Sequence, residues 1–218
     1  MVYESGWRFA AVFLVIAGLA AGFFTFTYLA KQTPRTGLEL PDGRQMEVTP
    51  VDAMRVRTAE TAPAIDPESY RLRVIGLVDR PLELSFAELQ QLPAAEELVD
   101  LPCVEGWTET GLRRGPRLYS ILEMAGMQPD ADNVVLSSLG GYTTSLTPAE
   151  INGTDPILAY GANGVSLPDR LGFPLRLVVP HHLGYKWIKW VIGIEVIQGD
   201  YRGYWESRGY PNQAQTDR

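Results

Sequence analysis

Hydrophobic and polar positions divide this chain into three successive regions. Residues 9–30, FAAVFLVIAGLAAGFFTFTYLA, contain no charged side chain and are long enough to cross a bilayer as a helix. The next residues, 31–67, mix Pro, Thr and charged side chains without a helical or alternating period. From Tyr70 onward, short apolar runs alternate with turn residues, as in a globular domain. We therefore predict a transmembrane anchor over residues 1–30, an extended linker (a tether or an arm lying over the domain) over 31–69 and a folded domain over 70–218.

Within the folded region, strand-like segments outnumber helical ones. The runs YRLRVIGLV, ELVDLPC, NVVLSSL and PLRLVVP are typical of strands, and WIKWVIGIEVI is the longest β-like run. A helix is predicted for SFAELQQL, in which Ser85 and Glu88 match a capping box, and another for GPRLYSILEMAG, which Gly126 would end. Thr147 would cap a one-turn helix in TPAEI. Because strands and helices do not alternate regularly, we expect a β-rich α+β domain rather than a doubly wound sheet.

The apolar segment at the N-terminus has a second interpretation as a cleaved signal peptide. Signal peptides have an apolar core of about 7–15 residues, shorter than this run, and TYLAKQ is a poor cleavage site, so an uncleaved anchor is favoured. One basic residue, Arg8, precedes the segment, whereas Lys31, Arg35 and Arg44 follow it. By the positive-inside rule this small bias places the domain in the cytoplasm.

Composition limits the classes of partner. The chain has 218 residues, 45% of them hydrophobic and 21% charged, so it can bury a sizeable core. Its net charge of −7 argues against a nucleic-acid-binding protein, which would present a basic face. An anionic ligand would therefore need arginine and lysine side chains gathered locally.

The single cysteine, Cys103, follows an apolar strand and begins the sequence CVEGW. It cannot form an internal disulfide or a cysteine-rich metal cluster. Two interpretations remain: a small buried hydrophobe, or the one thiolate that a soft metal needs. The only histidines, His181 and His182, are adjacent, so on a strand they would face opposite ways and could not chelate one metal; a surface role is expected.

Several motifs in order along the chain resemble one family. CVEGW, RGPRLYSILEMAG, LSSLGGYTTSL, ILAYGANGVSLPDRLGFPLRLVVP, GYKWIKWV and GYWESRGYPN, between Tyr70 and Asn212, are similar to the molybdopterin-binding domain of the sulfite oxidase family. The short prokaryotic members are most similar, among them the catalytic subunit of periplasmic methionine sulfoxide reductase. The resemblance implies a sulfite-oxidase-type fold and a molybdopterin cofactor. It also implies that Cys103 supplies a thiolate to molybdenum and that Tyr160 passes a proton beside the metal.

The resemblance further implies which residues hold the cofactor. Arg176 matches an arginine that contacts the pterin, and Ser138 matches a serine or threonine that hydrogen-bonds the cofactor. The stretch YKWIK matches one that wraps the cofactor with backbone amides and basic side chains, here Lys186, Trp187, Ile188 and Lys189. In an extended segment Lys186 and Lys189 would point to opposite faces, so only one need reach the anion.

Some positions depart from the family pattern. Glu105 stands near the cysteine where sulfite oxidases have an arginine, so it would repel sulfite unless Arg113 or Arg114 folds back. Gly140 replaces a common aspartate, Leu171 replaces a histidine or asparagine, and no clear pterin-binding match precedes Tyr70. These losses leave open a domain that keeps the fold without the cofactor, as a structural or interaction subunit of a membrane electron-transfer complex.

The leading hypothesis is a membrane-anchored molybdenum oxidoreductase that exchanges an oxygen atom with a small substrate in a two-electron step. With one cysteine and no CxxCH motif, the chain cannot hold its own iron–sulfur cluster or c-type haem. We therefore expect a haem-bearing membrane subunit or a cytochrome complex as partner, with the bilayer contacted through residues 9–30. The family resemblance favours a single-pass membrane protein whose domain is extracytoplasmic, against the small charge bias.

Overall fold

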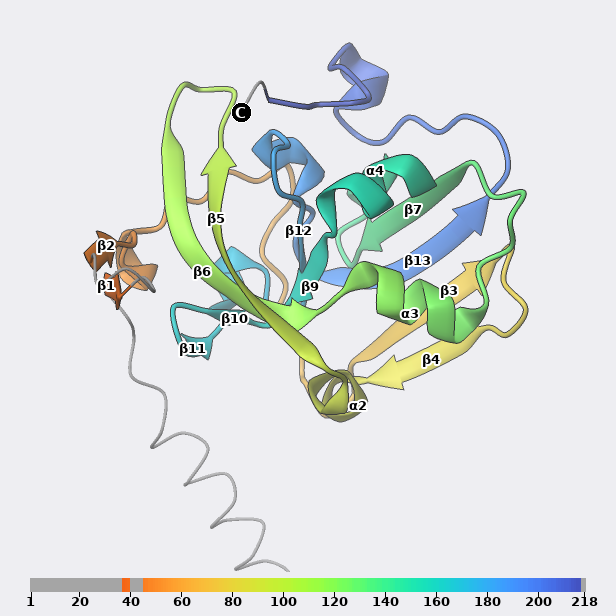
Figure 1. Ribbon diagram of the computed structural model, residues 1–218, viewed down its shortest axis with the longest axis horizontal. Coiled ribbons are helices and arrows are strands. Elements are labelled where there is room, and N and C mark those ends of the chain that lie inside the picture. The colour runs from red at the N-terminus through yellow and green to blue at the C-terminus, as the bar shows by residue number, and fades with distance from the viewer. Residues whose placement is uncertain (1–36, 40–44, 217–218) are drawn as a thin grey trace, which may run out of the picture. The chain divides into compact units, whose positions relative to one another are not determined.

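The computed structural model describes residues 37–39 and 45–216 (Figure 1). All the described residues belong to one compact unit of the chain. The predicted anchor over residues 9–30 lies outside the described residues. Among the residues that are described, no helix is long and apolar enough to span a membrane.

A five-stranded sheet with the order β4-β3-β13-β7-β8 forms one part of the domain (Figure 1). Strand β13 pairs in parallel with β3 and antiparallel with β7, and the outer pairs are antiparallel. Leu72 and Val74 of β3 are fully buried between exposed neighbours, as the predicted alternation requires. The strands are β3 (Arg71–Gly76), β4 (Leu82–Ser85), β7 (Asn133–Ser138), β8 (Thr143–Leu146) and β13 (Val191–Ile197).

The other part of the domain is built on a long antiparallel hairpin, β5 (Ala94–Pro102) and β6 (Thr108–Pro116), which continues into a four-stranded sheet of order β11-β10-β6-β5. A separate two-stranded sheet joins β9 to β12. Gly115 lets β6 approach β9 closely, because a Cβ at this position would lie 1.9 Å from the carbonyl oxygen of Leu158. The short strands are β9 (Ile157–Ala159), β10 (Gly161–Ala162), β11 (Val165–Ser166) and β12 (Arg176–Val178).

Among residues 37–39 and 45–216, three short α-helices connect the strands, and two of them, α3 and α4, lie against the five-stranded sheet (Figure 1). The capping box expected at Ser85 is present, and the expected cap at Thr147 is also a capping box, with Glu150. The helix that Thr147 caps is longer than the single turn predicted. Helix α3 buries one face against the sheet and ends at Gly126, whose φ of 70° is left-handed. The helices are α2 (Phe86–Gln91), α3 (Leu118–Ala125) and α4 (Pro148–Thr154), with 3-10 turns η1 (Val51–Ala53), η2 (Asp169–Leu171), η3 (Gly184–Lys186) and η4 (Glu206–Arg208).

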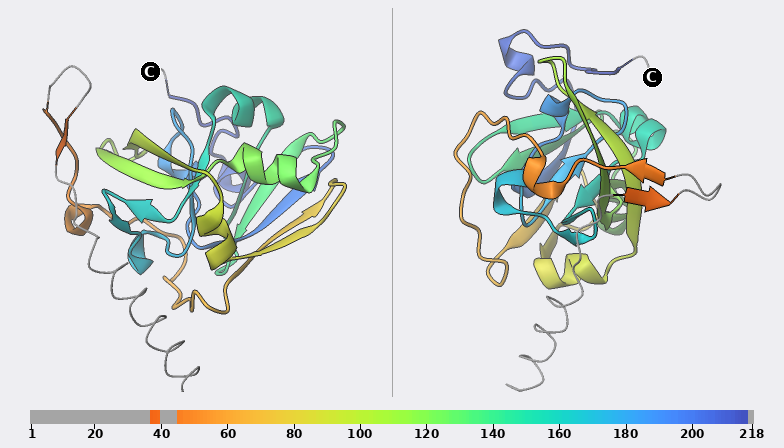
Figure 2. Two further views of the ribbon diagram at one scale, coloured as in Figure 1. Left: turned by 60° about the horizontal axis from the view of Figure 1, so that its bottom comes forward. Right: turned by 90° about the vertical axis from the view of Figure 1, so that its left-hand side faces the viewer.

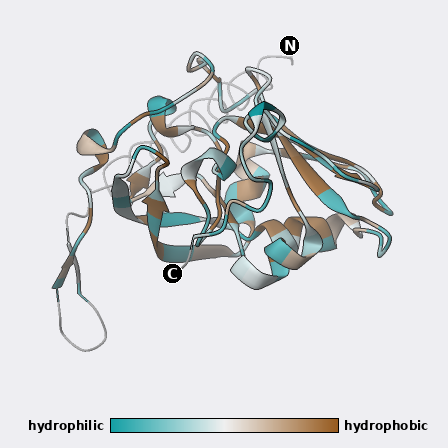
Figure 3. Ribbon diagram, turned by 90° about the horizontal axis from the view of Figure 1, so that it is seen from above, coloured by the Kyte–Doolittle hydropathy of each residue, from teal (hydrophilic) through white to brown (hydrophobic). Residues whose placement is uncertain are grey.

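The expected β-rich α+β class is confirmed, and two local predictions are wrong. The run WIKWVIGIEVI is a strand only from Val191 onward, because Trp190 has a φ of 53° that breaks the extended backbone. The nine-residue strand β6 is absent from the sequence prediction, since TETGLRRGP is polar and glycine-rich. Pairing with β5 along its whole length stabilises it. Figure 3 shows hydrophobic and hydrophilic residues alternating along the sheets.

The segment before the domain lies against it. Strands β1 (Gly37–Glu39) and β2 (Gln45–Glu47) pair with each other, and residues 45–60, here called the arm, continue across the domain (orange in Figure 2). Met54 is 2% exposed, and the backbone N–H of Thr49 donates to the carbonyl of Thr110 on β6 at 2.8 Å. This part of the predicted linker therefore packs on the domain.

Candidate functional site

A cavity of about 320 Å³ lies where the arm meets the end of the β5–β6 hairpin. Its volume is in the range of small-molecule sites. Residues far apart in the sequence form its wall: arm residues 55–60, the turn that follows β5, the strand residue Arg176, and the stretch from Gly184 to Lys189 without Lys186. The aromatic side chains of Tyr142, Trp205 and Tyr210 also line it, together with Leu101, Arg170 and Leu171.

Cys103 reaches this cavity from a tight turn at the tip of the hairpin. Its backbone N–H donates to the carbonyl of Trp107 at 2.9 Å, and its own carbonyl accepts from Gly106 at 3.0 Å. The turn leaves the thiol half-buried and free at the cavity wall, rather than packed in the core. In the part of the chain that is described, no three His, Cys, Asp or Glu side chains gather as metal ligands. A metal here would take one protein thiolate.

Arg176 brings a buried cation to the cavity from β12. Its guanidinium donates to the carbonyls of Leu171 at 3.1 Å and Trp187 at 3.3 Å, while its Nε has no hydrogen-bond partner. Burial, followed by the nearby Arg113, lowers the pKa of Arg176 to about 9, so the guanidinium is still charged at neutral pH. A buried donor without a partner is unfavourable, which makes this position receptive to an acceptor.

Lys189 is another cation of the wall, and it is half-buried. Its ammonium group donates to the arm carbonyl of Arg57 at 2.8 Å and lies 4.7 Å from the ring centroid of Trp190. Burial lowers the pKa of Lys189 to about 7, and the charge of Arg176 acts in the same direction. An anion beside the two side chains would oppose both causes, because a nearby opposite charge favours the protonated form of Lys189.

A second buried arginine, Arg113, lies near Arg176. Arg113 is 1% exposed and does not line the cavity. Burial lowers the pKa of Arg113 to about 10, and its Nε also lacks a partner. Glu109 is the buried carboxylate that acts electrostatically on both arginines. One carboxylate against the charges of Arg113 and Arg176 leaves this region with excess positive charge, although the chain as a whole is acidic.

The stretch matched to YKWIK divides between two environments. Trp187 and Ile188 are buried and line the cavity with Lys189. Lys186 instead forms a buried ion pair with Glu206 at 2.8 Å, so its charge is already balanced away from the cavity. The expectation that one lysine of the two reaches the cavity agrees with this arrangement, but the segment is not extended, because η3 (Gly184–Lys186) is a 3-10 turn.

Two other predicted site residues do not line the cavity. Tyr160 is buried beside β10, and its ring packs edge-on against Phe86 with centroids 6.2 Å apart. Ser138, at the end of β7, donates from its hydroxyl to the carboxylate of Glu60 at 2.7 Å. Glu60 does line the cavity, so Ser138 is linked to it through this arm residue.

The arm also supplies cavity residues that the sequence patterns did not indicate. The guanidinium Nε of Arg57 lies 2.8 Å from both carboxylate oxygens of Glu105, whose Oε2 accepts from the indole of Trp107 at 3.0 Å. The hydrogen bond from Arg57 is the main cause that holds the pKa of Glu105 below its usual range. Neither of the two arginines that could have folded back toward Glu105 lines the cavity, and Arg113 is buried beside Met54.

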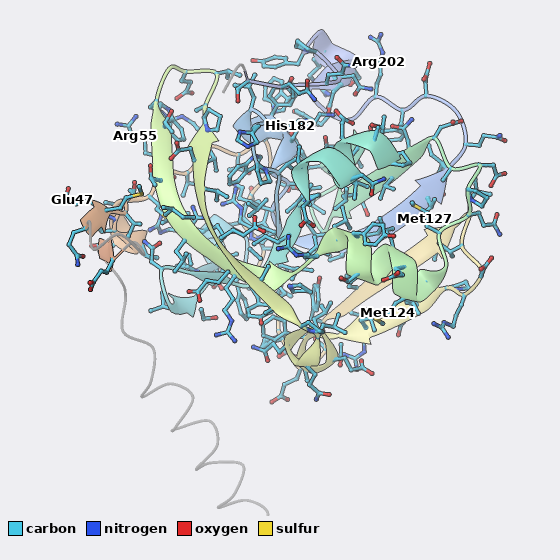
Figure 4. All side chains as sticks on the ribbon, in the orientation of Figure 1. Glu47, Arg55, Met124, Met127, His182 and Arg202 are labelled. Carbon is cyan, nitrogen blue, oxygen red and sulfur yellow. The ribbon has the colours of Figure 1, made fainter. Side chains whose placement is uncertain are left out.

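His182 corrects another expectation. It is fully buried rather than on the surface, and its Nε2 lies 3.5 Å from a carboxylate oxygen of Glu150 (Figure 4). Arg55 of the arm lies beside the hairpin in the same view, with its guanidinium carbon 5.2 Å from the ring centroid of Trp107. The spacing of Arg55 and Arg57 was the one signal in the sequence of the arm that could have pointed to cations there.

Comparison with known proteins places this geometry in context. Residues 59–205 match the family described as the oxidoreductase molybdopterin binding domain. The uncharacterized oxidoreductase YuiH of Bacillus subtilis is 38% identical over 146 residues, which cover 66% of this chain and 74% of that protein. The putative protein-methionine-sulfoxide reductase subunit YedZ1 of Azospira oryzae is 34% identical over 146 residues, 67% of this chain and 56% of that protein.

More distant similarity extends to larger proteins. Sulfite oxidase of Arabidopsis thaliana is 26% identical over 200 residues, and the match covers 75% of this chain and 51% of that protein. The crystal structure of the sulfane dehydrogenase SoxCD from Paracoccus pantotrophus superposes with a TM-score of 0.61 at 22% identity, covering 75% of this chain and 51% of that one. This chain therefore spans about half the length of both proteins and shares the fold of the second.

Proposed function

Because the chain belongs to the family of the oxidoreductase molybdopterin binding domain and has a sulfite-oxidase-type fold, we propose that its cavity is the site of two-electron oxygen-atom transfer to or from a small substrate. The observation that carries the proposal is that one cavity wall combines a free half-buried thiol, Cys103, with a buried cation, Arg176, and a half-buried one, Lys189. The cofactor of this family is molybdopterin.

The residues present fit that cofactor. Molybdopterin is anionic through its phosphate, and the wall offers Arg176, with an unpartnered Nε, and Lys189, whose lowered pKa reflects buried charge without an anion. A guanidinium can bind phosphate oxygens with two parallel hydrogen bonds. Molybdenum bound to sulfur is a soft centre, and Cys103 offers one more soft ligand at the same cavity.

Each side chain has a distinct task in this proposal. When bound, the cofactor supplies a two-electron redox centre that can exchange an oxygen atom. Cys103 would bind the metal through its thiolate, and Arg176 with Lys189 would hold the phosphate. Trp187 and Ile188, both buried in the wall, would keep bulk water away. Tyr160 and Lys186 do not line the cavity and receive no direct role.

We further propose that the domain is tethered to a membrane through residues 9–30 and exchanges electrons with a haem-bearing membrane subunit or cytochrome complex on the extracytoplasmic side. The uncharged apolar run supports the tether. Electrons must leave the chain, because its single cysteine cannot serve a second thiolate-bound centre. A relative named as a reductase subunit is consistent with a partner.

The decisive experiment measures molybdenum and pterin in the full-length protein purified from a host that makes the cofactor. We expect about one molybdenum per chain in the wild type and little in Cys103→Ser, because a hydroxyl is a harder and less acidic ligand than a thiol. Thermal unfolding of the cofactor-free proteins should be nearly the same, since the two side chains are similar in size. A wild type without molybdenum would favour a structural subunit, and full metal content and turnover in Cys103→Ser would show that another group binds the metal.

A further inference from the structure

The carboxylate of Glu60 occupies a prepared position at the cavity wall. Its Oε2 accepts a hydrogen bond from the Ser138 hydroxyl at 2.7 Å and a longer one from the backbone N–H of Tyr142 at 3.3 Å. The same N–H donates to the hydroxyl of Ser138 at 2.9 Å, which completes a small network. The arm thus places the Glu60 carboxylate at the end of β7, where Ser138 and Tyr142 both donate to its Oε2.

Ser138 is committed to this network. A serine hydroxyl has one proton to donate, and here that proton points to Glu60. Ser138 therefore cannot donate to a ligand while the contact exists. The resemblance to the family implies a hydrogen bond between Ser138 and the cofactor, and while the contact with Glu60 exists the hydroxyl could take part in it only as an acceptor.

The backbone next to Ser138 is also shaped for the carboxylate. A Cβ on Gly140 would lie 2.1 Å from the Oε2 of Glu60, closer than any real contact of that kind. The aspartate of the family pattern would force the Glu60 carboxylate out of this position and would repel its charge. The carboxylate of Glu60 can therefore take this position only because residue 140 is a glycine.

Glu60, which lines the cavity, can still accept further hydrogen bonds. A carboxylate has about four lone-pair positions, of which the network engages two, both on Oε2. The other carboxylate of the wall, Glu105, already accepts from Arg57 and Trp107. Glu60 thus has more accepting capacity left than Glu105, including its whole Oε1, whereas Arg176 and Lys189 supply positive charge.

We propose that Glu60, held in place by Ser138, is the hydrogen-bond acceptor for the N–H groups of the pterin ring. The pterin carries an amino group and ring N–H groups that need acceptors when buried, and a charged acceptor forms the stronger hydrogen bonds. Ser138 is then a positioning residue that acts through Glu60. The inference rests on the proposed function, that is, on molybdopterin binding in this cavity.

A different role for the same carboxylate would give the opposite result. If Glu60 instead blocked the cofactor by taking the Ser138 hydroxyl, then removing it would make loading easier. The two possibilities can be separated by the amount of pterin that each purified variant carries and by the rate at which the pterin leaves.

The experiment compares full-length wild type, Glu60→Ala, Glu60→Gln and the matched control Glu68→Ala, an exposed glutamate outside the cavity wall. Pterin released by denaturation is oxidised and measured by fluorescence, before and after extended dialysis. We expect Glu60→Ala to lose pterin about ten- to one-hundred-fold faster than wild type, the effect of losing a hydrogen bond to a charged group. Glu60→Gln should be intermediate, and Glu68→Ala should match wild type.

A double-mutant cycle tests the task given to Ser138. Ser138→Ala should speed pterin loss in the wild-type background and have little further effect in Glu60→Ala, because it acts through the missing carboxylate. Unfolding of the cofactor-free variants provides the readout for general damage, which would lower stability without changing pterin loss selectively.

The outcomes distinguish failure of the inference from failure of the proposed function. Wild type without pterin overturns the proposed function and this inference together. Wild type that carries pterin, with Glu60→Ala retaining it equally well or loading more of it, overturns the inference alone. Additive effects of the two substitutions overturn the positioning role of Ser138.

Discussion

Lys189 shows how a single side chain is tuned by its surroundings. Its ammonium group is largely withdrawn from water and lies near Arg176, and these two causes lower its pKa to about 7. Glu60 acts in the opposite direction without restoring the usual value. Near neutral pH the protonation of Lys189 therefore depends on whether an anion is bound beside it.

This predicts a pH-dependent affinity of the cofactor-free protein for sulfate, an anion that does not titrate in this range. As the pH rises from 6 to 8, the protonated fraction of Lys189 falls from about 0.9 to about 0.1, so sulfate affinity should fall about ten-fold. Isothermal titration calorimetry at several pH values measures the change.

The control is Lys189→Met, which should bind sulfate weakly and with little pH dependence over the same interval. The lowered pKa of Lys189 also affects the free energy of unfolding. Between about pH 7 and pH 10.5 the unfolded chain binds more protons at Lys189 than the folded one, so the contribution of Lys189 makes the protein more stable as the pH rises through that window. If sulfate affinity depended on pH equally in the wild type and in Lys189→Met, another group would be the one that titrates.

At the scale of elements, the arm is the segment whose packing most affects the site. Met54 anchors it in a small apolar cluster with Ala162, Leu167 and Leu171, and its sulfur contacts the guanidinium of Arg113. Arg170 donates to the carbonyl of Met54 at 2.7 Å. The residues that follow, 55–60, line the cavity, so the anchor point holds Arg57 and Glu60 in position.

Met54→Ala should therefore destabilise the protein by about 2–4 kcal/mol, the usual cost of removing a buried methionine side chain. It should also expose the arm to limited proteolysis and speed the loss of cofactor. Asp52→Ala, an exposed change two residues away, is the matched control and should leave both properties unchanged. Denaturant unfolding and a protease time course measure the effects, and an unaltered digestion pattern in Met54→Ala would contradict the role given to the arm.

At the scale of the whole molecule, the proposed function requires an electron route out of the chain. The domain contributes one cysteine, and the described residues hold no cluster of metal ligands. A two-electron reaction at the cavity must then be coupled to a redox group elsewhere. Residues 9–30 would keep the domain next to a bilayer, where such groups are carried by membrane proteins.

Gentle detergent extraction of the full-length protein should accordingly yield a complex larger than the monomer, with the visible absorption of haem. Size-exclusion chromatography with in-line spectroscopy makes the measurement. Cys103→Ser is the control, because a change at the cavity should leave a membrane companion in place. A monomer without haem that turns over at full rate with a soluble electron carrier would exclude the partner.

Local signals in the sequence were sufficient for much of the fold. Alternation in YRLRVIGLV, the capping boxes at Ser85 and Thr147, and the stop at Gly126 each depend on neighbours within a few residues. Because the residues in such interactions are close in the sequence, the helices and most of the strands could be predicted. The count of one cysteine likewise limits the possible metal chemistry, because it holds whatever fold the chain adopts.

The tertiary structure alone decided which charges meet. Strand β6 has little apolar pattern and forms because β5 pairs with it along its length. Arg57 and Lys189 are more than a hundred residues apart, yet the arm, the first residue of β12 and the segment before β13 bring Arg57, Arg176 and Lys189 to one cavity. The family resemblance pointed to Arg176 and Lys189, but not to Arg57 or Glu60. Burial, ion pairing and pKa depend on such distant neighbours, and local sequence patterns do not encode them.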